Sequence, residues 1–235
     1  MTLDEFSGQP GACAGRVSQV KRKAFEHSGK TAIITGGAGD IGRAVGRELH
    51  QRGMNLVIAD IDGHSAQEFA DEMGEGVVSV VGDLTQEAEN VRLLEATKAT
   101  FGGCDVVINN LAITSSERFH ERSTASMIKE IEIVMLAPIL LSRLAIPMLQ
   151  ASRDPRIITI TSLAGVIPLR ETPIYTAAKF GLRGAMLAFA LDEENHGISV
   201  SCVLPTAISA PNSPGDLSSS NERMSAAIMT FPLLA

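Results

Sequence analysis

Short apolar runs alternate with longer amphipathic segments along most of the chain, and this alternation restricts the fold more than any other feature. The first run, TAIIT at residues 31–35, is aliphatic and β-branched, which is typical of a buried strand. The next segment, residues 40–52, places Ile41, Val45 and Leu49 four apart, as one face of a helix requires. Short apolar strands that alternate with helices predict a parallel sheet covered on both faces.

The complete pattern predicts an α/β fold with a doubly wound, mostly parallel sheet. Right-handed crossovers give such a Rossmann-type sheet the strand order 3-2-1-4-5-6. The expected strands are residues 31–35, 55–60, 77–81, 104–109, 156–162 and 198–204, and the expected helices are residues 40–52, 64–73, 85–101, 123–150 and 173–195. Pro138 is expected to kink the fourth of these helices, and Pro147 to lie in its last turns.

Changes of composition divide the chain into three expected regions. Residues 1–29 contain several glycines and a proline and are expected to form an N-terminal arm. Residues 30–205 are expected to form one domain, which the motifs described below predict to be the dinucleotide-binding catalytic domain. Residues 206–235 combine proline, glycine and a serine run with no strand-like segment, so we expect a shortened tail and no seventh strand. The sixth strand would then lie at an edge of the sheet.

Composition and charge exclude several classes of protein. Twenty Lys and Arg against 27 Asp and Glu give a net charge of −7, which argues against a nucleic-acid partner. No uncharged apolar run is long enough to span a membrane, and no secretory signal is visible. The three cysteines are far apart, which indicates a cytoplasmic protein without a disulfide framework. The five histidines lack metal-ligand spacing, so no metal site is expected.

A glycine-rich turn follows the first strand and opens the first helix. Gly36, Gly39 and Gly42 recur at every third position there. Glycines let the backbone approach a pyrophosphate, and a helix N-terminus supplies free N–H groups. Glycines also make ordinary tight turns, but their place between a strand and a helix favours a dinucleotide site.

Asp60 closes the second strand, where a carboxylate can accept hydrogen bonds from both hydroxyls of an adenosine ribose. The same carboxylate would repel a 2′-phosphate. No Lys or Arg lies between Gly36 and Gly42 or directly after Asp60, so NAD is favoured over NADP. The alternative is that Asp60 only starts a loop or caps a helix. Similarly, Asp83 could reach the adenine or cap the next helix, and Asn110 could line the ribose or end a strand.

Tyr175 and Lys179 lie four residues apart within a predicted helix, so their side chains share one face. Ser162 ends the preceding strand, at the carboxyl edge where such sheets bind ligands. An ammonium group and an oxidised nicotinamide both favour the phenolate form of a nearby tyrosine, so we expect a pKa of Tyr175 below the roughly 10 of a free phenol. Tyr175 is the only tyrosine in the chain. A Tyr–Lys pair at this spacing can also merely decorate a helix.

These motifs, taken in order, resemble the short-chain dehydrogenase/reductase family over about residues 28–212. The matching segments are TGGAGDIG (35–42), Asp60, Asp83-Leu84, NNLA (109–112), Ser162, YTAAK (175–179) and Pro205-Thr206. The resemblance implies an NAD(P)-dependent oxidoreductase that interconverts a secondary alcohol and a ketone by hydride transfer. It implies that Tyr175 is the acid/base, that Lys179 lowers its pKa and orients the ribose, and that Ser162 polarises the carbonyl. The implied cofactor-binding residues are Gly36, Gly39, Asp40, Ile41, Asp60, Ile61, Asp83, Leu84, Asn110, Ala112, Tyr175, Lys179, Pro205, Thr206 and Ile208.

The chain departs from the family pattern at several positions. Asp40 replaces the second glycine of the turn, and Ala112 replaces the glycine of NNAG. Val134 occupies the position of an asparagine that helps a water connect the catalytic lysine to solvent. These departures and the short tail keep two alternatives open: a lyase, isomerase or cyclase on the same fold, and a non-catalytic NAD-binding protein.

Two further expectations concern partners. The apolar residues Leu163, Ile167, Leu169 and Ile113 near the predicted site indicate a hydrophobic small-molecule substrate. The helices at residues 123–150 and 173–195 match the helices that commonly form one subunit interface in the family, so we expect a homodimer or a higher homo-oligomer.

Overall fold

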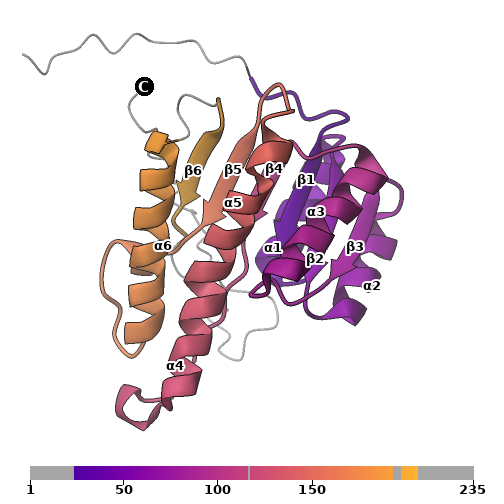
Figure 1. Ribbon diagram of the computed structural model, residues 1–235. Helices are drawn as coiled ribbons and strands as arrows, with labels where there is room; N and C mark the ends of the chain where they lie inside the picture. The colour runs from indigo at the N-terminus through magenta and orange to yellow at the C-terminus, as the bar shows by residue number, and fades with distance from the viewer. Residues whose placement is uncertain (1–23, 116, 193–196, 206–235) are drawn as a thin grey trace, which may run out of the picture.

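The computed structural model describes residues 24–115, 117–192 and 197–205. They form a six-stranded sheet in the order β3-β2-β1-β4-β5-β6, in which every pair of neighbouring strands is parallel (Figure 1). The sequence predicts this fold class and this strand order, and both are confirmed.

The elements follow one another as the sequence predicts. The strands are β1 (Thr31–Thr35), β2 (Asn55–Asp60), β3 (Val77–Val81), β4 (Val106–Asn109), β5 (Arg156–Ile160) and β6 (Ser199–Val203). The α-helices are α1 (Asp40–Gln51), α2 (Gly63–Met73), α3 (Glu87–Phe101), α4 (Thr124–Ile131), α5 (Ala137–Leu149) and α6 (Pro173–Asp192). Short helical segments are η2 (Phe119–Glu121), η3 (Glu132–Leu136) and η4 (Leu163–Gly165).

Helices cover both faces of the sheet. Helices α1 and α2 lie behind it in the view of Figure 1, whereas α3, α5 and α6 lie in front. Each face has its own apolar core. Phe69 and Ile34 belong to the core under α1 and α2, and Leu141 and Leu182 belong to the core under the other three helices. The central strand β1 is buried along its whole length because it is covered from both sides.

Because all six strands run in the same direction, their carboxyl ends meet at one edge of the sheet. Thr35 at the end of β1 is in register with Ala59 of β2, and Asn109 at the end of β4 is in register with Thr159 of β5. Ile160 of β5 is likewise in register with Val203 of β6. The glycine-rich turn, Asp60, Asn110, Ser162 and Pro205 therefore follow their strands at this one edge.

The long helix of residues 123–150 contains a π-helical turn. The segment η3 separates α4 from α5, and the N–H of Ala137 donates to the carbonyl of Glu132, five residues earlier. Pro138 has no N–H, so it cannot form the α-helical bond to the carbonyl of Val134. The disturbance that the sequence predicts at Pro138 therefore takes the form of a π turn just before it. Pro147 lies in the last turn of α5, as predicted.

The same helical run, Thr124–Leu149, is long and apolar enough, by length and composition alone, to cross a membrane. In the structure it packs within the helical layer, against α3 and α6. Only 33% of its most apolar window is buried. A core helix of a globular protein passes the same test, but this helix also shows apolar surface on its outer side.

The predicted regional boundaries at residues 29 and 205 stay predictions. Residues just before β1 already contact the domain: the ring of Phe25 packs against the core under α1 and α2, and the Arg156 guanidinium lies 4.4 Å from its centroid. Residues 1–23 and 206–235 lie outside the described residues, as does any strand that they contain. Within the described part of the chain, β6 is an edge strand with β5 as its neighbour.

Candidate active site

The turn between β1 and α1 depends on glycine at Gly36 and Gly42. Gly36 has a φ of +58°, a left-handed conformation that favours glycine. A Cβ on Gly42 would lie 2.5 Å from the carbonyl oxygen of Gly36 and 2.6 Å from the Cα of Gly37. The helix α1 begins at Asp40 without a hydrogen bond from a capping side chain, whereas Asp62 caps α2. The first N–H groups of α1 are therefore available to an anion.

Asp60 presents its carboxylate beside this turn. One oxygen accepts from the N–H of Ala38 at 3.1 Å, and the other accepts from the N–H of Asp62 at 3.1 Å. Asp60 thus holds the start of the β2–α2 loop, but Asp62 is the cap of α2. The neighbouring Ile61 is 66% exposed, so its side chain can pack against a bound ligand.

The end of β4 is joined to the glycine-rich turn by Thr35 and Asn110. The Thr35 hydroxyl accepts from the N–H groups of Asn110 and Leu111, at 3.0 and 3.1 Å. The Asn110 amide donates to the carbonyls of Thr35 and Gly36, at 3.1 and 2.9 Å. Asn109 is buried instead and donates to Ser142. Sequence reasoning does not identify Thr35, although its place directly before the glycines is a signal that it orients the turn.

The predicted residues after β3 occupy two different environments. Asp83 is exposed and accepts hydrogen bonds from the N–H and the hydroxyl of Thr85. Its side chain therefore orders the loop before α3 and does not cap that helix, whose N-cap is Gln86. The side chain of Leu84 is 6% exposed and belongs to the apolar core. Ala112, after β4, is exposed at the same edge of the sheet.

Ser162, Tyr175 and Lys179 come together at the carboxyl edge. Ser162 follows β5, and its hydroxyl accepts from the N–H of Ala164 and shares a hydrogen bond with the Tyr175 hydroxyl. Lys179 lies one turn after Tyr175 in α6, with its Nζ 5.6 Å from the centroid of the tyrosine ring. That Nζ donates to the carbonyl of Ile160 at 2.9 Å. The spacing of the sequence predicts this proximity.

Burial sets the pKa values of this trio in the cofactor-free protein. Burial lowers the pKa of Lys179 to about 8, because the residue is only 1% exposed and loss of solvent disfavours its charged form. Burial also raises the pKa of Tyr175, the hydrogen bond from Ser162 lowers it, and the negative charge of Glu130 raises it further. The expected pKa of Tyr175 below that of a free phenol is therefore wrong for this state, because desolvation outweighs the favourable contacts. Lys179 is not among the groups that lower this pKa.

Glu130 is an acidic residue near the site that sequence reasoning does not identify. It lies on α4, is 1% exposed, and forms a buried ion pair with Arg122, which is 4% exposed in its side chain. Among the described residues its Oε1 atom has no hydrogen-bond partner. The signal in the sequence is a glutamate one turn before Val134, in the buried phase of an otherwise apolar helix.

The remaining predicted residues lie around this trio or outside the described part of the chain. The carbonyl of Pro205 accepts from the N–H of Leu163 at 2.9 Å, which places the end of β6 beside Ser162. Thr206 and Ile208 lie outside the described residues, so their predicted roles stay predictions.

The described residues contain no group of three His, Cys, Asp or Glu side chains that could hold a metal ion. Cys104 and Cys202 are buried, and burial raises the pKa of these thiols to about 12 and about 11.

The arrangement fits a dinucleotide. The uncapped start of α1 provides N–H donors for a pyrophosphate, and Gly36, Gly37 and Gly39 add no side chain to the turn that precedes it. The Asp60 carboxylate, held by two backbone N–H groups, is placed to accept from ribose hydroxyls. The trio of Ser162, Tyr175 and Lys179 lies at the same edge of the sheet.

Comparisons with known proteins agree with this geometry. A family model described as short chain dehydrogenase matches residues 30–219. L-fucose dehydrogenase of Mus musculus is 34% identical over 186 residues, which are 79% of this chain and 67% of that protein. (+)-Borneol dehydrogenase 1 of Salvia officinalis is 28% identical over 190 residues, which are 80% of this chain and 73% of that protein.

The same relationship holds in three dimensions. A crystal structure of a short chain dehydrogenase/reductase from Burkholderia phymatum in complex with NAD superposes with a TM-score of 0.75 at 25% identity. The superposition covers 78% of this chain and 68% of that one, so this chain spans about two thirds of the length of its relatives. On the fold, the ordered motifs and these matches, the chain belongs to the short-chain dehydrogenase/reductase family of oxidoreductase enzymes.

Proposed function

We propose that this protein is an NAD-dependent oxidoreductase that interconverts a secondary alcohol and a ketone. The observation that carries the proposal is the meeting of Ser162, Tyr175 and Lys179 at the sheet edge that also holds Asp60 and the glycine-rich turn. Two relatives named as dehydrogenases, of L-fucose and of (+)-borneol, support a dehydrogenase reaction. The NAD in the related crystal structure supports the choice of cofactor.

In this proposal Tyr175 is the acid/base. In the direction of oxidation its phenolate oxygen accepts the hydroxyl proton of the alcohol, and in reduction the phenol donates that proton to the forming alkoxide. The Ser162 hydroxyl already contacts the Tyr175 oxygen, so it can donate to the same substrate oxygen and stabilise its developing charge. NAD, when bound, supplies the acceptor of the hydride.

Lys179 has two tasks in the proposal. Its ammonium lies 5.6 Å from the centroid of the tyrosine ring, and although it does not lower the pKa of Tyr175 in the cofactor-free protein, its positive charge would favour the phenolate in the NAD complex. It can also donate to the ribose of the nicotinamide, while its hydrogen bond to the Ile160 carbonyl keeps the ammonium in place. Because burial already lowers the pKa of Lys179 to about 8, a nearby anion such as the phenolate is needed to keep the ammonium charged at alkaline pH.

The sequence predicts the residues that would hold the cofactor, and the structure separates those that would bind it through the backbone from those with an accessible side chain. Gly36, Gly39, Asp40 and Ile41 would bind the pyrophosphate through the backbone. Asp60 would accept from the adenosine ribose. The buried Leu84 can contribute only through its backbone, whereas Ile61, Asp83 and Ala112 are exposed toward solvent.

We further propose that the substrate has an apolar part. Ile113, Ile167 and Leu169 are 40%, 46% and 38% exposed, and they follow β4 and the segment after Ser162. Aliphatic side chains that remain exposed beside a polar catalytic trio are typical of a pocket for a small organic ligand.

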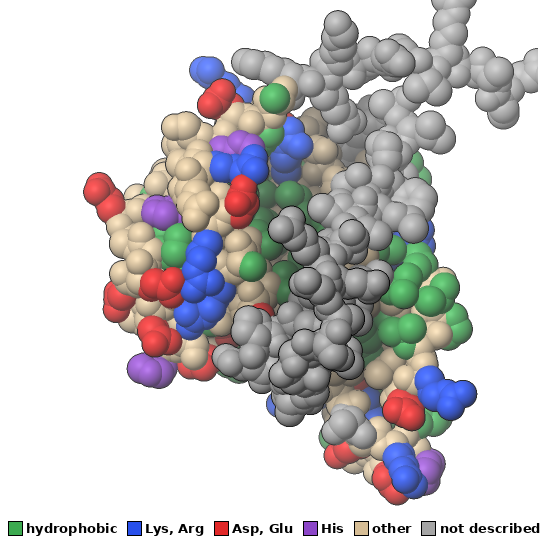
Figure 2. All heavy atoms as spheres, turned by 180° about the vertical axis from the view of Figure 1, so that it is seen from behind, with side chains coloured by type: hydrophobic (Ala, Val, Ile, Leu, Met, Phe, Trp, Pro, Cys, Tyr) green, Lys and Arg blue, Asp and Glu red, His purple; other side chains and the backbone are tan. Residues whose placement is uncertain are grey.

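We also propose that the protein is a homodimer in the cytoplasm. Its large exposed apolar residues on the helical layer include Ile128, Leu136, Phe180 and Leu191, on α4, η3 and α6. Figure 2 shows hydrophobic side chains gathered on the side of the molecule that α6 forms. A helical face with such apolar surface is typical of a subunit interface. The location rests on free, buried cysteines, which suit a reducing compartment.

The test of the proposed reaction is turnover of candidate alcohols with NAD, followed through the absorbance of reduced nicotinamide. We expect reduction of NAD with a secondary alcohol that carries an apolar group, and we expect Tyr175→Phe to abolish it while NADH binding is retained. Conversion of substrate without a net change in NADH would instead support a lyase, isomerase or cyclase. Binding of NADH without any reaction over a broad panel of alcohols and ketones would support a non-catalytic role.

A further inference from the structure

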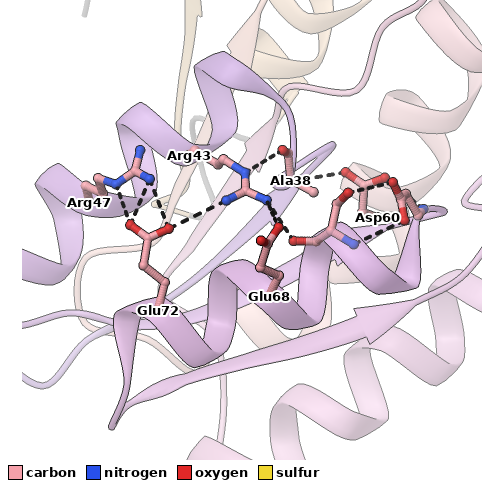
Figure 3. Close-up of polar contacts among 8 residues, drawn as sticks. Ala38, Arg43, Arg47, Asp60, Glu68 and Glu72 are labelled. Atoms are coloured by element: carbon pink, nitrogen blue, oxygen red, sulfur yellow. Dashed lines mark hydrogen bonds and ion pairs between the residues drawn. The ribbon is translucent and has the colours of Figure 1, made fainter.

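Arg43 lies one position beyond the glycine-rich turn, on the first helix, and its guanidinium reaches back over the turn (Figure 3). Its Nε donates to the carbonyl of Ala38 at 2.9 Å, and its Nη2 donates to the carbonyl of Ser65 at 3.0 Å. The first carbonyl belongs to the glycine-rich turn and the second to the first turn of α2. Arg43 therefore joins the two segments between which the proposed ribose site lies.

These two bonds complete a closed ring of hydrogen bonds around Asp60. Asp60 accepts from the N–H of Ala38, and its other oxygen accepts from the N–H of Asp62. Asp62 in turn accepts from the N–H of Ser65 at 3.1 Å. Arg43 links Ser65 back to Ala38. Among the described residues, both hydrogen bonds that orient the Asp60 carboxylate are thus part of a ring that Arg43 closes.

The charge of Arg43 is balanced by two glutamates of α2. Its Nη2 also lies 3.3 Å from Glu68 Oε2, and its Nη1 lies 3.6 Å from Glu72 Oε2. The guanidinium carbon lies 5.0 Å from the centroid of the Phe69 ring, which fixes its plane from one side. Its Nε and Nη2 donate to the two carbonyls and to Glu68, and its Nη1 faces the Glu72 carboxylate, so the charge of Arg43 is already balanced by acidic groups.

From this ring we propose that Arg43 is a positioning residue for the choice of cofactor: it holds Asp60 at the place where the carboxylate accepts from an unphosphorylated adenosine ribose. The inference rests on the proposed NAD dependence and deepens it. A carboxylate accepts two ribose hydroxyls only in a narrow range of orientations, so release of the loop weakens NAD binding. NADP does not use this carboxylate as an acceptor, so its binding changes less.

Arg47 provides a matched control for the charge and for the packing. It lies one turn further along α1, forms an ion pair with Glu72 at 2.8 Å, and its guanidinium carbon lies 5.2 Å from the centroid of the same Phe69 ring. Its described hydrogen bonds go to Glu72, and none joins it to the glycine-rich turn or to the start of α2. Arg47→Met therefore removes the same charge and the same stacking contact without opening the ring.

The experiment is a titration of wild type, Arg43→Met and Arg47→Met with NADH and with NADPH, followed by the fluorescence of the bound nicotinamide. The chain contains no tryptophan, so protein fluorescence does not interfere. For Arg43→Met we expect the Kd of NADH to rise about tenfold and the Kd of NADPH to change less than about threefold, the scale of one or two oriented hydrogen bonds. For Arg47→Met we expect both to stay within about twofold of wild type. Arg43→Lys, which can still reach one carbonyl, is expected to restore part of the loss.

A second measurement separates positioning from damage to the fold. If Arg43 acts through Asp60, Arg43→Met has no further effect on NADH binding in an Asp60→Ala background. An equal loss of NADH and NADPH binding in Arg43→Met, an effect equal to that of Arg47→Met, or an effect that persists without the Asp60 carboxylate would each overturn the inference. A wild-type protein that binds neither dinucleotide would overturn the proposed function itself, so the two failures are distinguishable.

Discussion

At the scale of single residues, buried polar groups set the chemistry of the carboxyl edge. Tyr175 and Lys179 were predictable from the sequence because side chains four apart on a helix share a face, and Ser162 was predictable because it follows a strand of a parallel sheet. The electrostatic environment of Tyr175 was not predictable, because it depends in part on Glu130, which is 45 residues away in the sequence. Glu130 comes near the tyrosine only because α4 packs against α6.

The first prediction concerns this glutamate. Ionisation of Tyr175 creates a negative charge that the buried Glu130 carboxylate disfavours, so Glu130→Gln is expected to lower the pKa of Tyr175. A titration followed by phenolate absorbance reports this residue alone, because the chain has one tyrosine. In the proposed oxidation, which uses the phenolate, the rise of the rate with pH is expected to shift to lower pH in the same variant.

Glu117→Gln is the control for Glu130→Gln. Glu117 also lies near Arg122, at 3.8 Å, but its side chain is 57% exposed and its charge is not among those that shift Tyr175. We therefore expect wild-type titration of the tyrosine in this variant. A pKa of Tyr175 that is unchanged or higher in Glu130→Gln would contradict the prediction, because it would mean that the Glu130 charge does not raise this pKa.

At the scale of the elements, the six strands and their order were predictable because apolar, β-branched runs alternate with amphipathic segments. Their ends are less regular: β4 begins at Val106, two residues after the predicted start, and β5 ends at Ile160, before Ser162. The π turn η3 was not predictable in form. A proline inside a helix predicts a disturbance, but whether the chain kinks or inserts a π turn depends on packing against α6, whose Gly181 approaches Met135 closely.

The second prediction concerns the connection of β1 to α1. A methyl group at Gly42 would meet the backbone of Gly36 and Gly37 at 2.5 and 2.6 Å, and backbone atoms cannot move aside as a flexible side chain does. Gly42→Ala is therefore expected to reduce the free energy of unfolding by about 2 kcal/mol or more, which is typical of overpacking at a rigid site. Urea unfolding followed by circular dichroism measures this change.

Gly39→Ala is the matched comparison for Gly42→Ala. Its Cβ would lie 3.5 Å from the nearest atom, the carbonyl oxygen of Gly36, which is an ordinary contact. The residue has a φ of −76°, which any amino acid adopts. We expect a change in unfolding free energy of less than about 0.5 kcal/mol, as at an open site. Equal destabilisation in the two variants would show that the turn does not depend on the close approach at Gly42.

At the scale of the whole molecule, the doubly wound sheet brings one set of residues, far apart in the sequence, to one edge. A second set, of apolar residues on the helices, faces outward. The ring through Arg43 and Asp60 belongs to the first set, and no local pattern in the sequence indicates it, because its members come from the glycine-rich turn, α1, the end of β2 and the start of α2 (Figure 3). The outward set lies on α4, η3 and α6, which keep large aliphatic and aromatic side chains exposed.

The last prediction is that this outward face joins two copies of the chain. Leu136 is 48% exposed and Phe180 is 40% exposed, and the two lie on neighbouring helical segments. A carboxylate at either position would lose its hydration in a dimer interface, which disfavours the dimer, but it would stay hydrated on the surface of a monomer. We expect wild-type protein to have twice the 24.8 kDa mass of one chain in size-exclusion chromatography with light scattering, and Leu136→Glu with Phe180→Glu to have the mass of one chain. Val91→Glu, on α3, places the same charge at a residue that is 39% exposed outside this face, and it is expected to leave the dimer intact. Wild-type protein with the mass of a single chain, or a double variant that remains dimeric, would contradict the prediction, because either result means that the apolar surface of α4 and α6 does not hold the subunits together.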